Sequence, residues 1–161
     1  HLRPESSMQF DPPKNQRSRS ALLMTGATGM VGSCVLARLM RSGIDCAVIV
    51  RDRRQGRSVV SAAERIDRIL STFEGFWHCQ LPRPDVIRGD LLAENLGLGE
   101  GKLNWIRNSC DLVLHSAASL SFAPASESEF NEPYRTNVGG TKAVLDLAER
   151  CGFEQFFVRR V

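Results

Sequence analysis

Short apolar runs alternate along this chain with longer segments in which apolar residues recur every three or four positions. The runs occupy residues 21–24, 46–50, 85–88, 111–115 and 153–158, and each is centred on Val, Ile, Leu or Phe. Runs of this length predict buried strands, and the segments between them predict helices with one buried face. Strands that alternate with helices favour a parallel sheet with right-handed crossovers. The pattern therefore predicts an α/β fold with about five strands in the order 3-2-1-4-5.

Local signals mark the limits of the predicted helices. Ser61 and Glu64 have the form of a capping box that starts the second helix. A brief helix is expected at residues 102–109, and a long one from about 132 to 150, with Gly152 as its stop. The residues expected to face inward from the long helix are Val138, Val144, Leu145 and Leu147.

Composition and charge exclude several classes of protein. The chain has 161 residues, of which 42% are apolar and 24% charged, and this suits one globular domain with its own core. No apolar run approaches the ~20 residues that a membrane span needs. The net charge is only +3, and the basic stretch at residues 51–57 is too short for a nucleic-acid face.

The cysteines and the N-terminal residues complete the general expectations. Five scattered cysteines form no metal-ligand or disulfide pattern, so we expect reduced thiols, a cytoplasmic protein and no metal site. Residues 1–20 are polar and contain three prolines. We expect them to be a flexible linker or a cloning remnant, and residues 21–161 to form the folded domain.

A glycine-rich stretch joins the first apolar run to the first helical segment. Residues 25–32 read TGATGMVG, between a predicted strand and a predicted helix. Such a turn presents backbone N–H groups to an anion, and the helix dipole favours a phosphate there. The three glycines would turn the chain, admit a pyrophosphate and let the helix pack closely; the alternative is a turn that binds nothing. The expected dinucleotide contacts are Gly26, Thr28, Gly29, Met30, Val31 and Gly32.

The second predicted strand ends at Arg51, 19 residues after Gly32. In NAD-binding domains an acidic residue near this place bonds the ribose 2′-hydroxyl, whereas an arginine accommodates the 2′-phosphate of NADP. A guanidinium is a planar fork suited to phosphate, and Arg53 and Arg54 are placed to assist unless this is a solvated basic loop. Asp52 is the competing residue, because its carboxylate turned toward the cofactor would favour NAD. We predict NADP(H), held by Arg51 and Arg54.

Two further segments follow predicted strands and are expected near the cofactor. A carboxylate after the third strand can reach the exocyclic amine of adenine, and small side chains after the fourth let the ribose and pyrophosphate approach the backbone. The residues concerned are Asp90, Leu91, Ser116, Ala117, Ala118 and Ser119.

Histidine, asparagine and glycine residues near the fourth strand and the last helix are the remaining candidates. His115 ends the fourth strand, and we expect a packed or hydrogen-bonded residue there rather than a proton donor. Asn137 is expected to face the site from the last helix. Gly139 and Gly140 each cost roughly 1 kcal/mol in a helix interior, which suggests close packing against a strand or the cofactor.

Together, the stretches TGATGMVGS, VRDRR, GDL, HSAASLSF and NVGGT resemble the extended short-chain dehydrogenase/reductases over about residues 20–160. Within that group they are most similar to the fatty acyl and thioester reductase branch. The resemblance implies a Rossmann-type, doubly wound sheet and NADPH-dependent reduction of an acyl thioester, on coenzyme A or a carrier protein, to an aldehyde or alcohol. It also implies that Asn137 lies at the cofactor and supports the catalytic proton relay.

The chain departs from that family at its catalytic pair. Such reductases use a Ser or Thr after the fifth strand and a Tyr-x-x-x-Lys pair further on, in which the tyrosine acts as the acid. The single tyrosine here is Tyr134, and Val138 stands where the lysine would be. We therefore expect the cofactor half of a reductase, truncated after strand five and without turnover of its own, whose exposed sheet edge favours self-association.

Two other interpretations stay open. The chain could be part of another extended reductase or epimerase, acting on a sugar nucleotide or a small carbonyl compound. It could also be a non-catalytic module that senses NADP.

Overall fold

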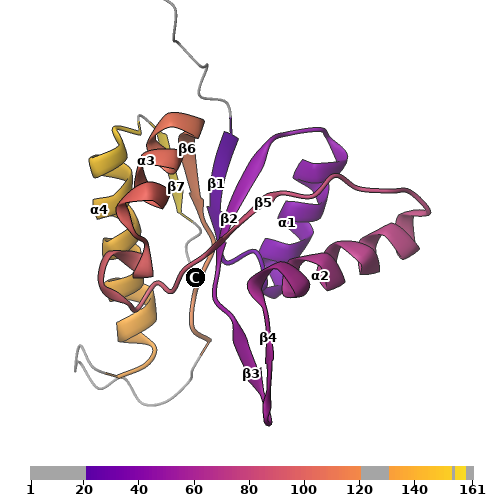
Figure 1. The fold of residues 1–161 in the computed structure, drawn as a ribbon, viewed down its shortest axis with the longest axis horizontal. Helices are drawn as coiled ribbons and strands as arrows, with labels where there is room; N and C mark the ends of the chain where they lie inside the picture. The colour runs from indigo at the N-terminus through magenta and orange to yellow at the C-terminus, as the bar shows by residue number, and fades with distance from the viewer. Residues whose placement is uncertain (1–20, 121–130, 154, 159–161) are drawn as a thin grey trace, which may run out of the picture.

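The centre of the fold is a five-stranded sheet in which neighbouring strands are parallel (Figure 1). The structure is a computed structural model that describes residues 21–120, 131–153 and 155–158, so the predicted linker at residues 1–20 lies outside it. The strands are β1 (Ala21–Thr25), β2 (Cys46–Val50), β5 (Asp85–Arg88), β6 (Cys110–His115) and β7 (Gln155–Val158). Their spatial order, β5-β2-β1-β6-β7, confirms the predicted order 3-2-1-4-5.

Helices cover both faces of this sheet. Those on one face are α1 (Met30–Arg41) and α2 (Ala62–Trp77), and those on the other are α3 (Glu100–Ser109) and α4 (Thr141–Cys151) (Figure 1). A 3₁₀ turn, η1 (Glu94–Gly97), precedes α3, and a π-helical turn, η2 (Arg135–Gly140), leads directly into α4. The molecule is therefore a doubly wound α/β domain, as the alternation of runs predicts.

Two hydrophobic clusters, one on each face, hold the layers together. Successive residues of a strand point to opposite faces, so Leu23 of β1 packs in the cluster that contains α3 and α4. Its neighbour Met24 packs in the cluster that contains α1 and α2. Both side chains are fully buried. Because both faces of the central strands are buried, apolar residues occupy successive positions in them instead of alternating with polar residues.

A β-hairpin after β2 was not predicted from the sequence. Its strands, β3 (Arg53–Gln55) and β4 (Ser58–Val60), pair antiparallel around a turn at Gly56, and the hairpin projects from the body of the molecule (Figure 1). Gly56 has φ +63°, the left-handed conformation that a glycine tolerates best. Strands of three residues are too short to show a periodicity, so the sequence showed only a basic loop.

The last helix departs from the single helix predicted over residues 132–150. The π-helical turn η2 changes the phase at which side chains leave the helix, and Val138 is consequently 47% exposed instead of buried. Leu145 is 45% exposed, because the buried face of α4 is formed by Val144 and Leu147. The inward placement predicted for Val138 and Leu145 is therefore wrong, whereas the placement of Val144 and Leu147 is confirmed.

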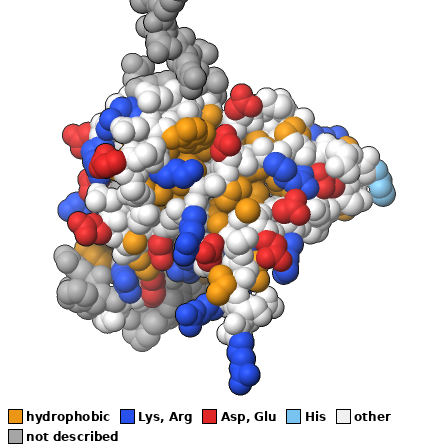
Figure 2. Space-filling model, viewed as in Figure 1, with side chains coloured by type: hydrophobic (Ala, Val, Ile, Leu, Met, Phe, Trp, Pro, Cys, Tyr) orange, Lys and Arg blue, Asp and Glu red, His pale blue; other side chains and the backbone are white. Residues whose placement is uncertain are grey.

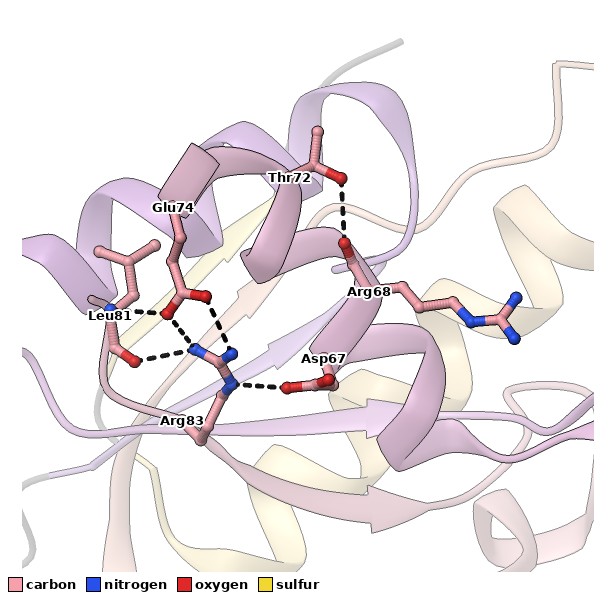
Figure 3. A network of polar contacts seen from close by, with 6 residues as sticks. All are labelled: Asp67, Arg68, Thr72, Glu74, Leu81 and Arg83. Carbon is pink, nitrogen blue, oxygen red and sulfur yellow. Dashed lines mark hydrogen bonds and ion pairs between the residues drawn. The ribbon is translucent and has the colours of Figure 1, made fainter. Parts of the chain in front are cut away.

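A network of charged side chains ties the end of α2 to the segment before β5 (Figure 3). Arg83 donates to both carboxylate oxygens of Glu74, at 2.6 and 3.1 Å, and to Asp67 at 2.8 Å. Glu74 also accepts the backbone N–H of Leu81 at 2.8 Å. The hydrogen bonds from Arg83 and from Leu81 lower the pKa of Glu74 to about 2. The network fixes the approach to β5 at the end of the sheet opposite to the glycine loop.

Candidate functional site

The glycine loop at the carboxyl end of β1 is shaped by two close backbone approaches. Gly26 has φ +77°, and a Cβ there would collide with the backbone of Ala117 after β6. A Cβ on Gly32 would collide with the carbonyl of Gly26, so this third glycine lets α1 pack against the turn. Gly29 is different: it is exposed, and a Cβ there would lie 3.3 Å from the Gly26 carbonyl oxygen. Its missing side chain leaves space on the open side of the loop.

The N-terminus of α1 presents free backbone donors beside that space. Gly29 caps the helix without a side-chain hydrogen bond, and the first turn contains no acidic residue. The N–H groups of a helix start and the positive end of its dipole therefore face the open side of the loop. This arrangement suits a phosphate group.

A cleft of about 280 Å³ extends from the glycine loop between the ends of β2, β5 and β6. Most residues predicted from the sequence to hold a cofactor come together along it. The predicted residues that line the cleft are Gly26, Thr28, Gly29, Met30, Val31, Gly32, Arg51, Asp90, Leu91, Ser116, Ala117 and Ala118.

A second, basic cavity of about 840 Å³ adjoins the cleft on the side of the hairpin and shares Arg51, Arg65, Gly89 and Asp90 with it. Arg53 and Arg54 line this cavity, so Arg54 is placed beside the cleft rather than in it. In Figure 2 several arginine or lysine side chains lie along the middle of the face shown and out to the tip of the hairpin, and others are scattered toward its edges.

Arg65 lies at the junction of the cleft and the basic cavity, and sequence reasoning missed it. Its guanidinium donates to the carbonyl oxygen of Arg51 at 2.6 Å and to the hydroxyl of Thr28 at 3.0 Å. Burial lowers the pKa of Arg65, and the positive charges of Arg53 and Arg51 lower it further. In the sequence, the capping box pointed to this placement. It starts α2 at Ser61, so Arg65 lies in the first turn of the helix and its direction is set there.

Asp52, the residue that would favour NAD, is already engaged by other groups. One carboxylate oxygen accepts the backbone N–H of Ala62 at the start of α2, at 2.9 Å. The other lies 2.9 Å from Nε of Arg88. Asp52 therefore bonds the start of α2 and pairs with Arg88, which leaves Arg51 and Arg65 as the basic side chains that line the cleft.

The loop after β6 forms the opposite wall of the cleft, and Asn137 holds it from behind. The side-chain oxygen of Asn137 accepts the Ser119 N–H at 2.7 Å, and its amide nitrogen donates to the Ser119 carbonyl at 3.2 Å. Neither residue lines the cleft itself. No strand packs closely against the two glycines: Gly139 faces open space, and Gly140 makes an ordinary contact with Leu91. Their packing against the cofactor stays a prediction.

His115 is a packed and hydrogen-bonded residue, as the sequence analysis favours. It is 2% exposed and lies 2.6 Å from the Thr25 hydroxyl and 3.0 Å from the Thr141 hydroxyl. Burial lowers its pKa, so the imidazole is neutral at pH 7. It does not line the cleft.

One orphaned polar atom tests whether the cleft fits a nicotinamide dinucleotide. The hydroxyl oxygen of Ser116 is buried and has no hydrogen-bond partner in the described part of the chain, although Ser116 lines the cleft. Buried hydroxyls ordinarily have a partner, so a ligand hydroxyl is a fitting one. The open side of the glycine loop and the N–H groups at the start of α1 add two further features that fit a dinucleotide.

Two other kinds of site are not seen in residues 21–120, 131–153 and 155–158. No group of three or more His, Cys, Asp or Glu side chains is placed to hold a metal ion within these ranges. No helix within them has both the length and the apolar character needed to cross a membrane.

Known proteins resemble the chain over most of its length. It is 27% identical over 135 residues to a Drosophila melanogaster protein named as a fatty acyl-CoA reductase, covering 80% of this chain and 25% of that relative. It is 29% identical over 145 residues to the adenylate-forming reductase Nps11 of Serpula lacrymans, covering 88% of this chain and 13% of the relative. The chain thus spans a quarter or less of these two relatives.

A solved structure and a family model agree with these relatives. The terminal R domain from the myxalamid PKS-NRPS biosynthetic pathway superposes with a TM-score of 0.66 and 27% identity, over 86% of this chain and 34% of that domain. A model of an NAD-binding family, described as male sterility protein, matches residues 24–159. These matches show a nicotinamide dinucleotide as the cofactor. The chain belongs to the male sterility protein family of NAD-binding domains.

Proposed function

We propose that this chain is the NADP(H)-binding part of a reductase that acts on an acyl thioester, either a fatty acyl-CoA or an acyl group on a carrier protein, and forms an aldehyde or alcohol. The choice of NADP(H) rests on one observation. Arg51 and Arg65 lie together beside the glycine loop, where the cleft opens into the basic cavity. A 2′-phosphate would be held there by charge-assisted hydrogen bonds.

The charges around this point support NADP rather than NAD. Arg51, Arg53 and Arg65 concentrate positive charge. Burial lowers the pKa of Arg65, and the charges of Arg53 and Arg51 lower it further, so these charges disfavour one another. A phosphate would offset that repulsion, whereas a 2′-hydroxyl would not. The carboxylate of Asp52, which could have accepted a hydrogen bond from a ribose hydroxyl, is engaged by Ala62 and Arg88.

Within the cleft each group has a role in holding the cofactor. The N–H groups at the start of α1 would hold the pyrophosphate, with Gly29 leaving room for it. Asp90 would meet the adenine and Ser116 a ribose hydroxyl, while the small side chains of Ala117 and Ala118 allow a close approach to the backbone. When bound, NADPH supplies the hydride, and the residues described here bind and orient it.

The names of the relatives support the acyl thioester as substrate. A fatty acyl-CoA reductase, an adenylate-forming reductase and a terminal R domain all match this chain. The second candidate, an extended reductase or epimerase for a sugar nucleotide or small carbonyl compound, shares the fold but commonly has an acidic residue in place of Arg51. A module that only senses NADP remains the third candidate.

We also propose that the protein is cytoplasmic and that it associates with itself. β7 is the outer strand of the described sheet, and Phe157 and Val158 are 55% and 45% exposed on it. This apolar edge supports self-association.

The substrate class is tested with the full-length protein that contains this chain. NADPH consumption is followed with a long-chain acyl-CoA and with an acylated carrier protein, and conversion of UDP-glucose in the presence of the dinucleotide is followed by chromatography as a control. We expect NADPH consumption with at least one thioester, release of a free thiol and no conversion of the sugar nucleotide. Turnover of UDP-glucose alone would favour the second candidate, and tight NADPH binding without any turnover would favour the sensing module.

A further inference from the structure

A line of hydrogen bonds runs behind the cleft from the end of β1 to the start of α4. The hydroxyl of Thr25 lies 2.6 Å from Nδ1 of His115, and Nε2 of the same ring lies 3.0 Å from Oγ1 of Thr141. The Thr141 hydroxyl donates to the carbonyl oxygen of Asn137 at 2.5 Å. Asn137 in turn bonds both backbone groups of Ser119. Three segments far apart in the sequence, at residue 25, residues 115–119 and residues 137–141, are thereby connected.

With a neutral imidazole, only one arrangement of protons satisfies these contacts. The single hydroxyl proton of Thr141 goes to the Asn137 carbonyl, because a carbonyl oxygen can only accept. Oγ1 of Thr141 must then accept from His115, which places the ring proton on Nε2. Nδ1 is left as an acceptor, so the hydroxyl of Thr25 donates to it. Donation therefore runs in one direction, from Thr25 to Asn137.

Each end of this line holds one wall of the cleft. Thr25 directly precedes Gly26 of the glycine loop. Ser119 directly follows residues 116–118, which line the opposite wall. The two walls also touch, because the Thr25 carbonyl accepts the N–H of Ser116 at 3.2 Å and Gly26 leaves no room for a Cβ against Ala117. The separation of the walls thus depends on groups that do not contact the space between them.

We propose that His115 and Thr141 are positioning residues for the dinucleotide, holding the glycine loop and the loop at residues 116–119 at the separation that the cofactor requires. The inference rests on the proposed binding of NADPH in this cleft. A cleft that is formed in advance binds its ligand more tightly, because less ordering accompanies binding. His115 is not an acid in the reaction: both ring nitrogens are engaged, and the ring lies outside the cleft.

The arrangement of protons is tested without any ligand. Nitrogen-15 NMR of the histidine side chains distinguishes the two neutral tautomers from the protonated ring. We expect His115 to be neutral at pH 7 with its proton on Nε2. A proton on Nδ1, or a protonated ring at pH 7, would overturn the proposed direction of donation.

The positioning role is tested by NADPH titration calorimetry on the 161-residue chain. Thr141→Val keeps the shape of the side chain but removes the hydroxyl, and we expect NADPH to bind about tenfold more weakly, as for the loss of ~1.4 kcal/mol. Thr141→Ser restores the hydroxyl and should restore the affinity. Thr72→Val is the matched control, since Thr72 makes the same kind of bond to the carbonyl four residues earlier, at 3.0 Å to Arg68, on the exposed side of α2.

The outcomes separate this inference from the proposed function. NADPH binding by Thr141→Val with wild-type affinity would overturn the inference alone, and so would a loss that Thr141→Ser does not restore. A wild-type chain that binds no dinucleotide would overturn the proposed function and the inference together. Circular dichroism checks the fold of each variant, and Thr141→Ala replaces Thr141→Val if the latter does not fold.

Discussion

Arg65 approaches the glycine loop from another element and adds positive charge to the proposed cofactor site. It donates to the backbone of Arg51 and to Thr28, so the start of α2 is tied to the end of β2 and to the loop after β1. Burial and like charges lower its pKa, but a guanidinium stays protonated at neutral pH. A positive charge that is retained in a partly buried place among other positive charges favours binding of an anion there.

Replacing Arg65 should weaken NADPH binding more than NADH binding. Arg65→Met keeps most of the apolar stem but removes the charge-assisted hydrogen bonds, each worth roughly 1.5–3 kcal/mol, or about tenfold to a hundredfold in affinity. Calorimetry with both dinucleotides measures the change. Arg68→Met is the control, because Arg68 lies three residues further on α2 and pairs with Glu64 in solvent. Equal losses for NADPH and NADH would exclude Arg65 from the 2′-phosphate site.

Gly29 offers a second test at the level of one residue. Gly29→Val should abolish dinucleotide binding, because a branched side chain would fill the space that the pyrophosphate needs. The fold should persist, since Gly29 has φ −82°, which any residue adopts. Gly99→Val is the matched control: Gly99 caps α3 with φ −80° and has open space around it. Unchanged NADPH binding by Gly29→Val would make the glycine loop a structural turn only.

At the level of elements, the sequence predicts the central strands β1 and β2 well because both of their faces are buried. Runs such as residues 46–50 contain little besides apolar side chains, and burial on both sides of a sheet requires that. The π-helical turn η2 could not be predicted, because its hydrogen-bond register leaves no mark on the apolar period. π-Helical turns often occur at functional sites, and this one contains Asn137, which holds the loop after β6.

The hydrogen-bonded Glu74 and the buried His115 predict how the free energy of unfolding changes with pH. The pKa of Glu74 is about 2 in the folded chain and 4.5 in the reference state, so its contribution is complete above pH 4.5 and is lost as the pH falls toward 2. Burial lowers the pKa of His115 below 6.5, so the free energy of unfolding also falls as the pH drops below 6.5. Urea unfolding across this pH range measures both losses.

Glu74→Gln serves as the control for the acid limb of that profile. The variant lacks the carboxylate, so its free energy of unfolding should vary less between pH 4.5 and 2 than that of the wild type. The loss below pH 6.5 should remain, because it belongs to His115. Identical acid limbs for the variant and the wild type would show that the bonds to Arg83 contribute nothing to the pH dependence.

In the whole molecule, the sheet topology determines where the site lies. It does not determine which side chains around the site engage one another. The reversal of strand order between β1 and β6 puts their carboxyl ends side by side, and the residues predicted from motifs meet there. Arg65 and the engagement of Asp52 by Ala62 depend instead on how α2 packs beside β2. No local pattern encodes that packing, so the sequence favoured Arg51 over Asp52 but could not show how Asp52 is engaged.

The most direct test of the account is the affinity of the wild-type chain for NADPH and for NADH, measured by titration calorimetry under identical conditions. The account predicts that NADPH binds about tenfold to a hundredfold more tightly, as expected for one charge-assisted phosphate contact. Arg51→Ala should remove most of that difference. Arg57→Ala, at the tip of the hairpin and outside both cavities, should keep it. Equal affinities in the wild type, or tighter binding of NADH, would contradict the account.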